Sequence, residues 1–147
     1  MLDRFELFAT TITQMYKNLQ RVKMQEMAGV TDMDLRGTHV MCLFQLNRHK
    51  EGLTVTQLST LCEEDKAATS RTVSELIQKQ LVAADTEKKY RAPITLTEDG
   101  QKVANLIDKQ AALAVQIIGQ DLTEEDREQF YRSLNIISEN LKNYLND

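Results

Sequence analysis

The chain has 147 residues, of which 41% are hydrophobic and 27% charged, and its formal net charge is −4. This balance is typical of a soluble globular domain and excludes a disordered tail protein. No run of about 18 apolar residues occurs, so no helix is expected to cross a membrane, and the first residues lack the pattern of a signal peptide. One Pro and five Gly leave long stretches without a breaker, which predicts a mainly α-helical protein.

Two cysteines, Cys42 and Cys62, are too few for a disulfide framework, and they indicate a reducing, cytoplasmic location. The charge is distributed unevenly. Residues 97–147 hold five basic and ten acidic groups, whereas Lys66 to Arg91 holds six basic and three acidic groups. This basic surplus in the middle of an acidic chain is compatible with a nucleic-acid contact, and also with an ordinary mixed surface.

Long amphipathic helices are predicted at both ends of the chain. Apolar residues recur at spacings of three and four, which predicts a helix over about 3–28. Thr97 and Thr123 begin two further helices that together fill about 99–146. We expect these helices to share a bundle between two chains. The expected dimer contacts are Phe5, Phe8, Ile12, Phe130, Leu134, Ile137, Leu141 and Tyr144.

The middle of the chain, about 34–98, contains shorter elements. A helix of about a dozen residues follows Asp34, and Thr54 and Asp65 are N-caps for two more short helices. Two short helices joined by about three residues have the spacing of a helix-turn-helix. In the second helix, over 66–80, the apolar periodicity predicts burial of Thr69, Val73, Leu76 and Ile77.

The residues of this second helix that burial does not need are small, polar or basic, as in a helix that enters the major groove. Alanines permit close approach, whereas serine and arginine can bond base edges or phosphates. An ordinary surface helix is the alternative. The candidate DNA contacts here are Lys66, Ala67, Ala68, Ser70, Arg71 and Ser74, with Thr54, Thr56 and Gln57 placed against phosphate from the preceding helix.

A β-hairpin is predicted next, because short apolar stretches at 81–84 and 94–96 flank a polar, basic segment. Pro93 lacks an N–H group, so its strand should be an edge or be bulged there. Lys88, Lys89 and Arg91 would contact the DNA backbone or the minor groove, although such a tip also serves to protect an edge strand. Three helices followed by a hairpin are the order of a winged helix.

Three stretches of the chain resemble the MarR family of bacterial and archaeal transcription regulators, at the family spacing. They run from Leu53 to Ser59, from Glu64 to Leu76 and from Ile94 to Gly100. The resemblance implies one domain over residues 1–147, mainly α with a small β-hairpin wing, in which long terminal dimerisation helices flank the winged helix. It also implies a homodimer that binds a pseudo-palindromic operator on double-stranded DNA, most often as a repressor. A small aromatic or anionic effector commonly releases such repressors.

The chain departs from the family pattern at two places. Members usually carry an Asp-x-Arg pair in the wing, where this chain has Lys88 and Tyr90. Gln80 stands where the recognition helix usually ends in Gly. The low basic surplus and the missing wing pair leave a rival hypothesis open, a helical dimer that binds protein or small ligands with a winged-helix lobe that has lost DNA affinity.

Other chemistry has little support in the sequence. His39 and Cys42 are three residues apart on one helix, but no further ligands accompany them, and we expect no metal or other cofactor. No catalytic constellation occurs, so we expect no enzyme. Methionine and aromatic side chains, with His39, are candidates for a pliable ligand pocket and equally for ordinary core packing. The candidate pocket residues are Met15, Tyr16, His39 and Phe44.

Overall fold

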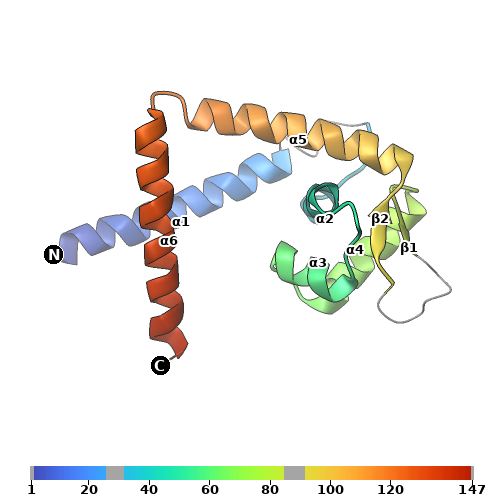
Figure 1. Ribbon diagram of the computed structural model, residues 1–147, viewed down its shortest axis with the longest axis horizontal. Helices are drawn as coiled ribbons and strands as arrows, with labels where there is room; N and C mark the ends of the chain where they lie inside the picture. Colours follow the sequence, from blue (N-terminus) through green and yellow to red (C-terminus); the bar gives the residue numbers. More distant parts are fainter. Residues whose placement is uncertain (1, 26–31, 85–91, 147) are drawn as a thin grey trace. The chain divides into compact units, whose positions relative to one another are not determined.

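The computed structural model describes residues 2–25, 32–84 and 92–146 (Figure 1). The chain divides into two compact units, Met1–Ala112 and Leu113–Asp147. In the described residues the elements follow in the order α1 (Leu2–Gln25), α2 (Gly37–Arg48), α3 (Val55–Cys62), α4 (Lys66–Gln78), β1 (Val82–Ala84), β2 (Ile94–Leu96), α5 (Glu98–Ile118) and α6 (Glu124–Asn146). The predicted fold class, mainly α with a small hairpin, is confirmed.

The helices begin at the residues that the sequence predicts. Thr54 Oγ1 accepts a hydrogen bond from the backbone N–H of Gln57 at 3.2 Å, while Gln57 Oε1 accepts from the N–H of Thr54 at 2.9 Å. This reciprocal capping box begins α3. Thr123 and Asp126 form the same arrangement ahead of α6. Because each cap needs only neighbouring residues, it is readable without tertiary information.

The core lies between α2, α3, α4, the hairpin and the first half of α5, which we call the lobe (residues 32–84 and 92–112). Leu43 and Leu46 of α2, Leu58 of α3, Leu76 of α4 and Ile107 of α5 are almost completely buried. Burying one such side chain contributes about 1.5–3 kcal/mol relative to leaving it exposed. The lobe therefore has an apolar core of its own.

The two strands form an antiparallel hairpin in which Val82 is opposite Leu96. On the other side of β2, Leu53 exchanges two backbone hydrogen bonds with Ile94, at 2.8 and 3.0 Å. At Ile94 the strand β2 is thus paired on both sides, with Ala84 and with Leu53, so it is not an edge there as expected. Pro93 lies one residue before β2, so its missing N–H interrupts no bond of the ladder.

The prediction that Ile77 of α4 is buried is wrong. Ile77 is 43% exposed, whereas Thr72 is buried together with Thr69, Val73 and Leu76. Successive helical residues are about 100° apart, so the face centred on Thr69, Thr72 and Leu76 leaves Ile77 at its margin.

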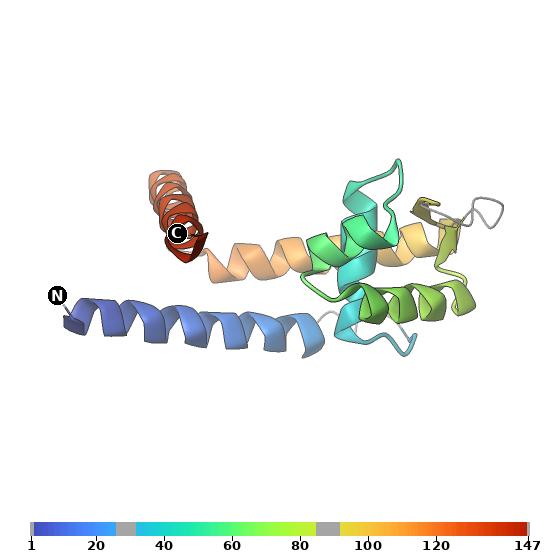
Figure 2. The same cartoon turned by 90° about the horizontal axis from the view of Figure 1, so that it is seen from below.

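The apolar seams of α1 and α6 are largely exposed. Phe5 is 67% and Tyr144 is 81% exposed, and no described residue of α6 is buried. Both helices are long and uninterrupted (Figure 2). No helix in the described part of the chain is long and apolar enough to cross a membrane.

Candidate nucleic-acid interface

Helix α4 presents the small and basic residues of the predicted DNA contacts on one face. Lys66, Ala67, Ser70, Arg71 and Ser74 are exposed, and Ala68 is half-buried. The opposite face carries the buried Thr69, Thr72, Val73 and Leu76. The core thus fixes which residues point outwards, and most of the residues predicted to contact DNA are among them.

The amino terminus of α4 is capped by Asp65, whose Oδ1 accepts from the N–H of Ala68 at 2.9 Å. Ser74 Oγ donates to the carbonyl oxygen of Ser70 at 3.0 Å, so its hydroxyl proton is already used and its oxygen is available as an acceptor. Such a serine suits a base-edge donor rather than a phosphate.

The two cations of α4 are unpaired within the described part of the chain, where neither Lys66 nor Arg71 forms an ion pair. An arginine that is exposed and unpaired keeps its five N–H donors for a guanine edge or a phosphate. An anionic partner could therefore bind Lys66 and Arg71 without breaking an ion pair among the described residues.

Helix α3 lies next to α4 and contributes its first turn. Thr56 and Gln57 are exposed, and Thr54 is half-buried at the cap. The capping box uses Gln57 Oε1 as an acceptor, which leaves the Nε2 amide as a donor. The wing residues Lys88, Lys89 and Arg91 lie outside the described residues, so their assignment stays a prediction.

A polar network that the sequence analysis missed joins the start of α2 to α4. The guanidinium of Arg36 donates to the carboxylate of Glu75 and forms an ion pair with it. His39 is 2% exposed, and its Nε2 lies 2.7 Å from the same carboxylate oxygen. The hydrogen bonds from Arg36 and then from His39 hold the pKa of Glu75 below its ordinary value. No local signal reveals this network, because its members are 36 and 39 positions apart.

The carboxyl terminus of α4 explains the departure at Gln80. Leu81 N–H donates to the carbonyl of Leu76 and Gln80 N–H donates to that of Ile77, which is the bonding pattern of a Schellman motif. The motif needs a left-handed residue, and Gln80 occupies it with φ 60°. The helix consequently ends at Gln78, two residues before the predicted end.

Gly100 fixes how α5 leaves this turn. A Cβ at Gly100 would lie 1.8 Å from the carbonyl oxygen of Leu81. Thr97 Oγ1 caps α5 by accepting from the Gly100 N–H at 3.0 Å, and it donates to the carbonyl of Gln80 at 2.7 Å. Helix α4, the hairpin and α5 are therefore joined at one tightly packed corner.

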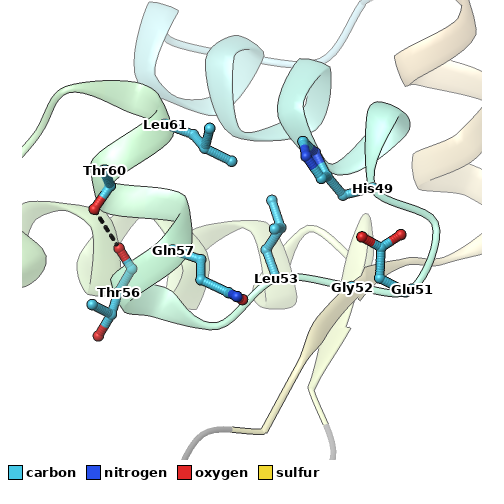
Figure 3. Close-up of a pocket in the computed structure, with 8 residues that line it drawn as sticks. All are labelled: His49, Glu51, Gly52, Leu53, Thr56, Gln57, Thr60 and Leu61. Carbon is cyan, nitrogen blue, oxygen red and sulfur yellow. Dashed lines mark hydrogen bonds between the residues drawn. The ribbon is translucent and has the colours of Figure 1, made fainter.

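A pocket of about 440 Å³ adjoins the first turn of α3 (Figure 3). It lies between the end of α2, the following loop and α3, with Leu53 and Leu61 as its apolar part. The lining residues are His49, Glu51, Gly52, Leu53, Thr56, Gln57, Thr60 and Leu61.

None of the four predicted pocket residues lines this pocket. His39 is buried in its network with Glu75, and the guanidinium of Arg48 lies 3.5 Å from the ring centre of Phe44. Met15 and Tyr16 are exposed on α1. A ligand site at these residues stays a prediction.

The two cysteines meet in the lobe. A hydrogen bond between the thiols of Cys42 and Cys62, and then burial, raise the pKa of Cys42 far above its ordinary value. A thiol with a raised pKa is a poor nucleophile. Within the described residues no group of three or more His, Cys, Asp or Glu side chains is arranged to hold a metal ion.

A helix-turn-helix with an exposed second helix, followed by an antiparallel hairpin, defines the winged-helix class. The MarR family model matches residues 29–89, which include α2, α3, α4 and β1. The resemblance seen in the sequence is thus confirmed over these residues, and the fold is that of a winged helix. A comparison with curated protein sequences gave no match.

Solved structures of MarR-family regulators have a similar fold. A MarR/EmrR family transcriptional regulator from Acinetobacter sp. ADP1 is 20% identical, with a TM-score of 0.77 over 97% of this chain and 99% of that chain. A MarR transcriptional regulator from Methanosarcina mazei Go1 is 23% identical, with a TM-score of 0.76 over 95% and 99%. Staphylococcus aureus MepR in complex with DNA is 20% identical, with a TM-score of 0.76 over 91% and 96%.

Proposed function

We propose that the protein is a homodimeric transcription repressor of the cytoplasm that binds a pseudo-palindromic DNA operator through α4. The observation that carries the proposal is the outward face of α4, where Lys66 and Arg71 are exposed among small and polar residues and form no ion pair with any described residue. The structure of MepR with DNA supports it, because that protein shares the fold over nearly the whole chain.

In the proposed complex, α4 lies in the major groove and each group has a separate task. Arg71 contacts a guanine edge or a phosphate, and Ser70 and Ser74 contact base edges. Ala67 and Ala68 admit the backbone close to the bases. Thr54, Thr56 and Gln57 hold phosphate at the start of α3, and Lys66 adds a contact that depends strongly on salt.

A dimer supplies the second half of the operator contact. The exposed apolar seams of α1 and α6 would be buried between two copies, because helices with such seams are stable only when covered. The two recognition helices would then reach major grooves about 34 Å apart. A small aromatic or anionic effector would act by changing the separation of the lobes.

The test is fluorescence anisotropy on a duplex that the purified protein selects from a random pool. We expect competitor-resistant binding that weakens steeply with salt. Arg71→Ala should weaken it by about ten- to a hundredfold, as the loss of a base contact does. Arg132→Ala, which removes an exposed arginine of α6, is the matched control. Equal binding of all duplexes by the wild type would favour the rival, a ligand-binding dimer without DNA specificity.

A further inference from the structure

Glu75 is the one acidic side chain of α4, and it is tied to another element of the lobe. It lies next to Ser74 of the outward face and next to Leu76 of the core. Its carboxylate accepts from the Arg36 guanidinium and lies 2.7 Å from His39 Nε2. The side chain of Glu75 is 39% exposed and that of His39 is 3% exposed, so the network reaches from the surface into the core.

The hydrogen bonds of His39 define its proton arrangement. The backbone N–H of Arg36 donates to His39 Nδ1 at 2.9 Å, so Nδ1 must hold a lone pair. The ring proton is then on Nε2, which donates to Glu75. One imidazole thus links the backbone at the start of α2 with a side chain of α4, and both of its nitrogens are satisfied.

We propose that His39 and Arg36 are positioning residues for DNA recognition, which fix the rotation of α4 through Glu75. This inference rests on the proposed function. The core contacts of α4 come from Thr69, Thr72, Val73 and Leu76. Apolar packing is largely non-directional, whereas hydrogen bonds to a carboxylate restrict direction. A recognition surface needs its side chains placed within about 10–20°.

The same network connects α4 with the chain that enters α2. Arg36 is the residue before α2, and it bonds α4 with its side chain and His39 with its backbone N–H. A displacement of the segment at 32–36 is therefore transmitted to the orientation of α4 rather than absorbed in a loose loop.

The variant Glu75→Ala distinguishes a positioning role of Glu75 from a purely electrostatic one, because the two roles predict opposite changes in DNA affinity. Removing a negative charge beside DNA should tighten binding if charge alone matters. If Glu75 positions α4, specific binding should instead weaken by about tenfold or more, comparable to a lost base contact. Non-specific binding should change little. The measurement is anisotropy with the selected duplex and with an unrelated duplex, at a temperature where circular dichroism shows each variant folded.

Three further variants test the chemistry. Glu75→Gln removes the same charge but keeps an oxygen acceptor for His39 Nε2–H, so its loss should be smaller. His39→Leu removes the donor without changing α4, and combined with Glu75→Ala it should add little to the single loss. Glu51→Gln removes an exposed charge from another part of the lobe and should leave binding unchanged or tighter.

The outcomes are distinct. Wild-type binding without any sequence preference overturns the proposed function, and the present inference with it. A specific wild type together with a Glu75→Ala variant of equal or higher affinity overturns only the positioning role. If His39→Leu does not fold, the two Glu75 variants decide, because their site is at the surface.

Discussion

The lobe buries its apolar residues, whereas the two end helices, α1 and α6, leave most of theirs exposed. In the lobe, Leu43, Leu58 and Leu76 from three different helices are completely buried against one another. In α6 no described residue is buried, and in α1 Phe5 is among the most exposed side chains. The lobe closes its own core, whereas the end helices leave apolar seams exposed, which the proposed dimer would cover.

This difference has a thermodynamic consequence. The stability of the lobe should depend on internal packing and not on protein concentration. In the proposed dimer the seams of α1 and α6 would be buried only on association, so their contribution to stability should depend on protein concentration.

Two charges on the α6 seam should convert the proposed dimer into a monomer. We expect Leu134→Glu with Leu141→Glu to raise the dimer dissociation constant at least a hundredfold, because each buried leucine contributes about 1.5–3 kcal/mol. Sedimentation equilibrium measures the change. The control, Asn135→Glu with Ser138→Glu, adds the same charge at exposed polar positions of α6. A monomeric wild type would remove the basis of the comparison.

Gly100→Ala should damage the lobe. The added Cβ would lie 1.8 Å from the Leu81 carbonyl oxygen. This oxygen belongs to the backbone, so it cannot move aside as the end of a flexible side chain could. We expect a loss of about 3 kcal/mol or more in the free energy of unfolding, at the upper end for overpacking. Urea unfolding is the measurement, with Lys109→Ala at an exposed position of α5 as control. A loss below about 1 kcal/mol would show that the corner is not tightly packed.

Gln80→Gly should stabilise the lobe. Gln80 has φ 60°, a conformation that costs a residue with a Cβ about 1 kcal/mol and costs glycine little. We therefore expect a gain of about 1 kcal/mol in urea unfolding. Lys79→Gly, one residue earlier and at φ −78°, should lose about 0.5–1 kcal/mol instead. Equal effects of the two changes would contradict the role of the left-handed turn.

The smallest expected effect is a loss of folding stability at acidic pH, in the lobe and in α6. Hydrogen bonds lower the pKa of Glu75 in the lobe and of Asp126 at the start of α6. Each folded pKa is below the unfolded one, so the stabilisation is complete above the ordinary value, 4.5 for Glu75 and 3.8 for Asp126, and is lost as the pH falls further.

Unfolding by urea between pH 7 and pH 3 should show this loss. Glu75→Gln and Asp126→Asn should each reduce it, while Glu128→Gln, at an exposed residue of α6, should not. If either Glu75→Gln or Asp126→Asn lost more stability in acid than the wild type, the lowered pKa of that carboxyl group would be contradicted.

Elements whose causes are local can be predicted from the amino-acid sequence alone. Thr54, Asp65, Thr97 and Thr123 cap helices because a side chain reaches a backbone N–H only three residues away. The apolar periodicity placed most of the α4 core correctly. It failed at Ile77, because periodicity alone cannot tell Thr72 from Ile77 at the margin of a buried face.

Which residues distant in the sequence come into contact depends on the tertiary packing. Glu75 with His39, Cys42 with Cys62, and Leu53 with Ile94 are pairs whose contacts follow from the packing of helices and strands. The sequence alone does not show why residue 100 must be glycine. The close approach of the Leu81 carbonyl, which leaves no space for a Cβ, explains it. Local rules fix the elements, because their hydrogen bonds span few residues. The contacts between elements depend on side-chain shape and direction across the core, which no local spacing encodes.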